Sequence, residues 1–150
     1  MTAILQCITL LTLTFSSFAA SAQSKTECID ESCILHFDST LNRSYYQVAE
    51  IMPTYRGGQD TLIATIRRNL RWPGGDCCIS GTVYVGFIIE PDGKVTSLRV
   101  LRSFLPNDKI CDVNKEALKV TDYLTDWIAG QCNGKNVPVY LALPIKFVMQ

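Results

Sequence analysis

The chain has 150 residues, the size of one domain with at most a short appendage. Lysine plus arginine and aspartate plus glutamate number 14 each, so the net charge gives no reason to expect nucleic acid or an acidic membrane as a partner. A single histidine excludes any site that needs two imidazoles, such as the zinc pair of a metalloprotease helix.

The N-terminal segment has the form of a secretory signal. Every charged residue lies at or after Lys25, and an apolar stretch over residues 3–18 precedes Ala20-Ser21-Ala22, a pattern that suits signal peptidase. We therefore expect residues 1–22 to be a signal peptide that is removed on export. The alternative is a retained membrane anchor, for which the stretch is marginal because about 20 strongly apolar residues are needed.

The cysteine count points to disulfides. Cys7 lies in the expected signal, and an even number of cysteines in the exported remainder is typical of a disulfide framework. A thiolate metal site is disfavoured because the chain has no C-x-x-C pair with a nearby histidine, and we expect no metal. The disulfide candidates are Cys28, Cys33, Cys77, Cys78, Cys111 and Cys132.

The first periodic segment follows a polar stretch, residues 23–49, that shows no sustained period and is expected to be an N-terminal extension of a domain over residues 50–150. After Gly57-Gly58, apolar residues recur at the spacing of one helix face. These residues are Leu62, Ile63, Ile66 and Leu70. The helix must end by Trp72, because Pro73 disfavours helical geometry in the residue before it.

Two strands joined by a tight turn come next. The segment 82–89 is rich in β-branched and aromatic residues, with Val83, Val85, Phe87 and Ile89 on one face and Tyr84 and Ile88 on the other. Pro91-Asp92-Gly93 has the composition of a β-turn, and Val95–Arg102 returns as the hairpin partner.

A second helix and a final strand complete the pattern. Asp112 is a natural N-cap, and the apolar stripe that follows it consists of Val113, Ala117, Val120 and Leu124. We expect Trp127 to close this helix and residues 130–136 to form a polar loop. Pro138 and Pro144 cannot donate to a ladder, so the last strand, residues 137–149, is expected at a sheet edge.

The order helix, strand, strand, helix, strand predicts an α+β fold with both helices on one face of a three-stranded mixed sheet. The sheet order should be 2-1-3, with the last strand antiparallel to the first and parallel to the second. The chain has no nucleophile elbow, no phosphate-binding loop and no plausible cysteine–histidine arrangement. We therefore expect neither an enzyme nor a cofactor, and no small-molecule substrate.

Ten short motifs follow one another between Glu50 and Phe147. They are Met52-Pro53-Thr54-Tyr55-Arg56-Gly57-Gly58, Asn69-Leu70-Arg71-Trp72-Pro73, Gly81-Thr82-Val83-Tyr84-Val85-Gly86-Phe87, Asp92-Gly93-Lys94-Val95, Val100-Leu101-Arg102-Ser103, Glu116-Ala117-Leu118, Trp127, Asn133-Gly134-Lys135, Val137-Pro138-Val139 and Leu143-Pro144-Ile145-Lys146-Phe147. In these motifs and their order, the chain resembles the C-terminal domain of TonB-type energy transducers of Gram-negative envelopes.

The resemblance implies a protein-binding module that docks the TonB box of an outer-membrane transporter by strand addition. It implies a periplasmic location, with anchoring in the inner membrane if the leader is retained, and leaves homodimer formation open. The chain lacks the family's long proline-rich spacer, so we expect a stand-alone form. The implied partner-binding residues are Arg71, Trp72, Pro73, Val139, Tyr140, Leu141, Ala142, Leu143, Ile145 and Phe147.

In the predicted sheet, the first strand (residues 82–89) begins beside the end of the second strand (Val95–Arg102). Cys77 and Cys78 shortly precede the first strand and Cys111 follows the second, so either Cys77 or Cys78 should bond to Cys111. Cys132 should lie at the opposite end, where Cys28 or Cys33 is a possible partner. The competing function is a secreted, disulfide-stabilised structural or inhibitor-like domain that does not dock a transporter.

Overall fold

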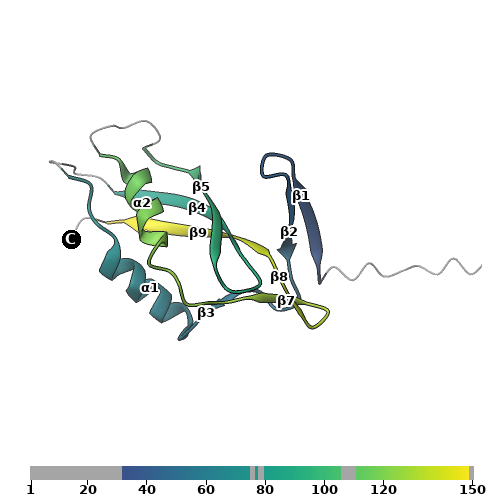
Figure 1. The fold of residues 1–150 in the computed structure, drawn as a ribbon. Coiled ribbons are helices and arrows are strands. Elements are labelled where there is room, and N and C mark those ends of the chain that lie inside the picture. The colour runs from purple at the N-terminus through teal and green to yellow at the C-terminus, as the bar shows by residue number, and fades with distance from the viewer. Residues whose placement is uncertain (1–31, 75–76, 78–79, 106–110, 149–150) are drawn as a thin grey trace, which may run out of the picture.

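The computed structural model describes residues 32–74, 77, 80–105 and 111–148, and the fold is an α+β arrangement in layers (Figure 1). The predicted signal peptide, Cys28 and Cys78 lie outside the described residues. In chain order the elements are β1 (Ile34–Asp38), β2 (Arg43–Val48), β3 (Thr54–Tyr55), α1 (Gly58–Asn69), β4 (Gly81–Ile89), β5 (Val95–Arg102), α2 (Val113–Thr121), β6 (Trp127–Ile128), β7 (Gly130–Cys132), β8 (Lys135–Val137) and β9 (Val139–Phe147).

The main sheet has five strands in the order β1-β2-β9-β4-β5. Within it, β5, β4 and β9 stand in the predicted 2-1-3 order, and β4 is antiparallel to both of its neighbours. The expectation of a three-stranded sheet is wrong, because the polar stretch assigned to an irregular extension contains a β-hairpin. The β1 and β2 strands pair antiparallel, and β2 joins β9 in parallel. The turn between β1 and β2 is closed by Asn42, which adopts a φ of 49°.

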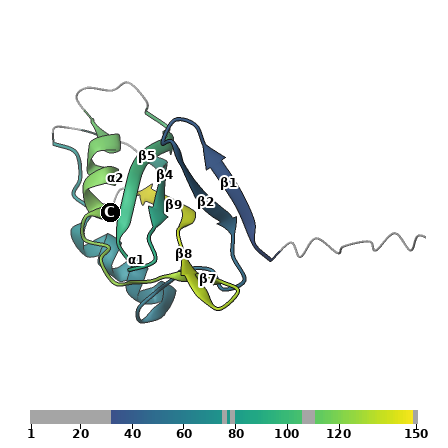
Figure 2. The ribbon, with the colours of Figure 1, turned by 45° about the vertical axis from the view of Figure 1, so that its right-hand side comes forward.

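Both helices cover one face of the sheet, and the β1–β2 hairpin lies on its other side (Figure 2). The predicted inward face of β4 is confirmed: Val83, Val85, Phe87 and Ile89 are fully buried in the main core. The α2 helix contributes Val113, Ala117 and Val120 to that core, and α1 contributes Leu62. The Asp112 carboxylate caps α2 as predicted by accepting a hydrogen bond from the Lys115 backbone N–H at 3.0 Å.

The region between α2 and β9 differs from the prediction. Trp127 does not close the helix but lies in β6, which pairs with β3, where it packs edge-on against Tyr55 with ring centroids 5.3 Å apart. Residues 130–137 form the β7–β8 hairpin rather than a loop. Asn133 and Gly134 both have positive φ, the conformation that a tight two-residue hairpin turn requires. Pro138 separates this hairpin from β9, so the last strand begins at Val139.

Two disulfides connect distant parts of the chain. Cys77 is bonded to Cys111, with Cα atoms 5.9 Å apart, which confirms the prediction that one of the adjacent pair bonds to Cys111. Cys33 is bonded to Cys132, with Cα atoms 6.1 Å apart, and this bond ties the segment before β1 to β7. Disulfides persist in oxidising compartments, so the chain is suited to an exported environment.

Candidate docking edge

The β9 strand has one fully paired side and one largely open side. It pairs with β4 along all of its length, whereas its only registered partner on the other side is Tyr46 of β2, opposite Val139. The Tyr46 backbone N–H donates to the Pro138 carbonyl at 2.8 Å. Beyond Tyr140, whose N–H faces the Tyr46 carbonyl in this parallel register, β9 has no strand partner on that side among the described residues.

The direction of the backbone groups follows from the bond to Pro138. Backbone groups of alternate residues in an antiparallel strand point to the same side. Because the Pro138 carbonyl points toward β2, the carbonyls of Tyr140, Ala142, Pro144 and Lys146 also point to the open side. Pro144 lacks an N–H, so the open side of β9 has a missing donor between those of Ala142 and Lys146.

The β5 strand, which is the edge strand on the far side of β4 from β9, is less regular. The register between β4 and β5 shifts twice, and at the second shift Ser97 adopts a φ of 54°. Bulges of this kind disrupt the ladder that an added strand would need, and they are a common protection of sheet edges. The β9 strand is instead paired in one unbroken register with β4. The expected edge position of the last strand is wrong, because β9 stands between β2 and β4; only its part beyond Val139 has an unpaired side.

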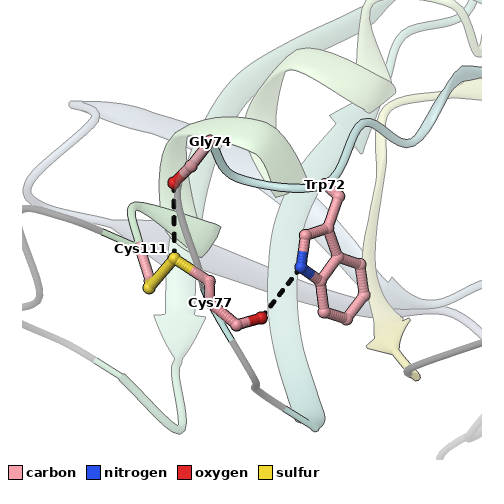
Figure 3. The surroundings of a disulfide bond; sticks show 4 residues. All are labelled: Trp72, Gly74, Cys77 and Cys111. Atoms are coloured by element: carbon pink, nitrogen blue, oxygen red, sulfur yellow. Dashed lines mark hydrogen bonds between the residues drawn. A yellow bond between two sulfur atoms is a disulfide. The ribbon is translucent and has the colours of Figure 1, made fainter.

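The structure brings the loop after α1 to the end of β9. The indole ring of Trp72 packs edge-on against Phe147 with ring centroids 6.0 Å apart. Its N–H donates to the Cys77 carbonyl at 3.0 Å, and Cys77 is held in turn by the disulfide to Cys111 (Figure 3). The Trp72 side chain is nevertheless 39% exposed, so it is an oriented aromatic surface near the open edge.

The remaining predicted site residues differ in what they can offer a partner. Arg71 and Ala142 are exposed, and Tyr140, Leu141 and Leu143 are half-buried, whereas Pro73, Val139, Ile145 and Phe147 are buried. The last three of the buried residues belong to β9 and can contribute only backbone groups. Direct side-chain contact with a partner is therefore open chiefly to Arg71, Trp72 and the half-buried leucines.

Basic residues occur at the end of α1, in the loop that follows it and on β9. Arg67 and Arg68 lie in the last turn of α1, Arg71 follows it, and Lys146 is exposed on β9. None of the four forms an ion pair within the described part of the chain.

The β1–β2 hairpin is held against the sheet by polar contacts that the sequence reasoning missed. The Arg43 guanidinium donates two hydrogen bonds to the Glu90 carboxylate, at 2.7 and 2.9 Å. Arg99 of β5 donates to Asp38 at 3.1 Å. We call these two ion pairs the hairpin latch. The local sequence signal for the hairpin was weak, because apolar and aromatic residues occur on each side of the short turn at residues 39–42 without a clear period.

An aromatic contact completes the attachment of the hairpin. Tyr45 stacks on Tyr140 of β9 with ring centroids 5.2 Å apart, and the Arg99 guanidinium lies 5.3 Å from the centre of the Tyr140 ring. The Tyr140 ring crosses β4 at Gly86, where a Cβ atom would collide with the phenol oxygen. Glycine at position 86 therefore gives Tyr140 the space to reach Arg99.

The Arg43–Glu90 pair makes the hairpin sensitive to acid. Hydrogen bonding to Arg43 lowers the pKa of Glu90; burial opposes this shift, and a further hydrogen bond from Thr96 supports it. A carboxylate whose pKa is lower in the folded state stabilises that state above its unfolded pKa, near 4.3, and ceases to do so as the pH falls through the folded value.

We therefore expect Glu90→Gln to lower the free energy of unfolding by about 1 kcal/mol at pH 7 and to have a smaller effect at pH 3. Urea titrations of both proteins between these pH values measure the difference. Glu116→Gln, which removes a pair on the surface of α2, is the matched control. An equal effect of Glu90→Gln at both pH values would contradict the assignment.

Several other features of the described residues do not extend the site. A shallow groove lies between β5 and α2, lined by Leu98, Leu118 and charged residues such as Asp112 and Asp122. No group of three metal-ligating side chains occurs in the described part of the chain. None of the described helices has both the length and the apolar character of a membrane span.

Comparisons with protein-family models, with curated proteins and with solved structures find no match for this chain. The geometry of the β9 edge and the resemblance in sequence are therefore the basis for the function proposed below.

Proposed function

We infer that this protein is a periplasmic binding module, similar to the TonB C-terminal domain, that docks the TonB box of an outer-membrane transporter by adding it as a strand to β9. The observation that carries this proposal is the open side of β9 beyond Val139, in unbroken register with the core strand β4. An accessible, straight edge is what strand addition requires.

Two further features support this proposal. The chain itself uses the β9 edge for strand pairing, since β2 joins it through Tyr46. Trp72, with the exposed Arg71 before it, lies at the far end of the same edge and is held by its hydrogen bond to Cys77. An oriented, partly exposed aromatic ring loses little conformational entropy on binding, which makes it a suitable anchor for an apolar segment.

The second candidate, a secreted structural domain without a docking partner, is favoured by the two disulfides. Such bonds stabilise small exported domains whatever their function. The two candidates differ in one respect that can be measured: only the docking module should bind extended segments in a way that depends on backbone groups of β9.

Two substitutions of opposite direction test the docking proposal. Ala142→Pro removes an open-side N–H and should weaken binding of a TonB-box peptide about ten-fold, whereas Pro144→Ala adds one and should strengthen binding about three- to ten-fold. Neither alters a group that faces β4. Isothermal titration calorimetry with box peptides gives the affinities, and Lys146→Gln is the control that changes charge but keeps the N–H.

The outcomes separate the candidates. If no box peptide binds the wild-type chain at high micromolar concentration, the docking function is rejected and the structural candidate stands. If a peptide binds with an affinity that neither Ala142→Pro nor Pro144→Ala changes, the peptide binds elsewhere and strand addition to β9 is wrong.

A further inference from the structure

The hairpin does more than extend the sheet, because β2 holds the beginning of the edge to which a partner would add. Its Tyr46 is in parallel register with Val139 and bonds to Pro138. Beside this contact, Ala49, Cys132 and Val139 form a small buried cluster of their own. A second strand cannot occupy this part of the edge while β2 is in place, since the Pro138 carbonyl on that side already accepts a hydrogen bond from Tyr46.

Further along β9, β2 no longer follows the strand. The two strands share a single registered pair, and the last residues of β2, Gln47 and Val48, have no partner on β9. The covered part of the edge and the open part therefore meet near Tyr140, whose ring is fixed between Tyr45 and Arg99. The open part extends from Ala142 to Phe147, which is long enough for about six residues of an added strand.

We propose that the β1–β2 hairpin is a stop that limits the length of the docked segment to about six residues and fixes its position on β9. This inference rests on the docking function proposed above and names a specificity determinant of the same site. A longer segment gains no backbone hydrogen bonds from its extra residues unless the hairpin leaves the edge.

The hairpin is suited to this role because it is attached firmly at few points. Most of its side chains are exposed, including Leu35 and Phe37, so it is not held by extensive apolar burial. It is held instead by the latch, by the stacking of Tyr45 on Tyr140, and by the disulfide from Cys33 to Cys132. These contacts are directional, and they place β2 at one defined position rather than allowing it to slide along the edge.

The experiment compares peptides of six and ten residues that share the same box sequence. The wild-type chain should bind both with affinities within about two-fold of each other. Tyr46→Pro removes the N–H that bonds to Pro138 and leaves the hairpin's own pairing intact, because that N–H points away from β1. In this variant the ten-residue peptide should bind about ten-fold more tightly than the six-residue peptide.

Ser44→Pro is the matched control. Ser44 lies two residues earlier on β2, so its N–H has the same direction, but it has no registered partner on β9. This variant should behave as the wild type does. Hydrogen exchange at the Tyr140 amide reports in each protein whether the hairpin has left the edge, and the double variant Arg43→Gln, Cys33→Ser is a second means of releasing it.

The outcomes distinguish the stop from the docking function. A ten-residue peptide that binds the wild-type chain ten-fold more tightly than the six-residue peptide would overturn the stop, whatever the variants do. Equal affinities in every variant whose Tyr140 amide has become exchangeable would overturn it as well, while leaving docking intact. If no peptide of either length binds any of the proteins, both proposals fail together.

Discussion

Replacing Cys33 and Cys132 with serine is expected to lower the free energy of unfolding by about 4.7 kcal/mol, one of the two largest effects that we expect from a change in this protein. The two residues are 99 positions apart. A bond between them restricts most of the described chain in its unfolded state, and the loss of chain entropy grows with the length of the closed loop. Urea unfolding of the oxidised wild type and of the double variant measures the difference.

The second disulfide is the internal comparison for this prediction. Cys77 and Cys111 are 34 positions apart, so the same entropic argument gives about 3.8 kcal/mol for their replacement. The variant without the Cys33–Cys132 bond should therefore be less stable than the variant without the Cys77–Cys111 bond, by roughly 1 kcal/mol. The reverse order would show that local contacts near each bond, and not loop length, determine its contribution.

The second large effect is expected from Phe87→Ala, which should lower the free energy of unfolding by about 3–5 kcal/mol. Phe87 is fully buried on the inward face of β4 and contacts Trp127 with ring centroids 5.7 Å apart. Removing the ring leaves a cavity between the sheet and β6 that the surrounding strands cannot readily fill. Because β4 supports β9, this variant should also lose any peptide binding near its unfolding midpoint.

Tyr84→Ala is the matched control for this core substitution. Tyr84 lies on the same strand but on the opposite face, and its side chain is 41% exposed. We expect a change of about 1 kcal/mol or less, since only part of the ring is withdrawn from water. Equal losses for the two variants would contradict the assignment of the inward and outward faces of β4.

The local signals in the sequence predicted the central elements correctly. The apolar stripe from Val113 to Val120 and the capping role of Asp112 depend on residues within two turns of helix. The alternation along β4 likewise places Phe87 inward through the geometry of the strand alone. The 2-1-3 order follows from short connections and chain direction, which leave few other arrangements for these elements.

The sequence predicted the candidate docking edge of β9 only in part, because local signals do not report contacts between distant parts of the chain. Pro144 correctly indicated that one side of the last strand lacks ladder bonds at that position, but the expected edge position is wrong, because β2 pairs with β9 and makes it the third of five strands. The sequence carried no comparable signal that the edge would be covered at Val139. That contact depends on Tyr46, which lies in a segment without a clear period and more than 90 residues earlier in the chain.

The sequence by itself therefore determined the two helices, the β4–β5 hairpin, the order of the three strands β5, β4 and β9, and the bond between Cys111 and one of the adjacent cysteines. Only the tertiary structure decided that a second hairpin joins the sheet and where it stops. Its position rests on Arg43 meeting Glu90, Asp38 meeting Arg99, and Cys33 meeting Cys132, pairs whose members are far apart in the chain. Periodicity reports the environment of neighbouring residues, whereas partners of this kind are selected by the folded geometry that brings them together.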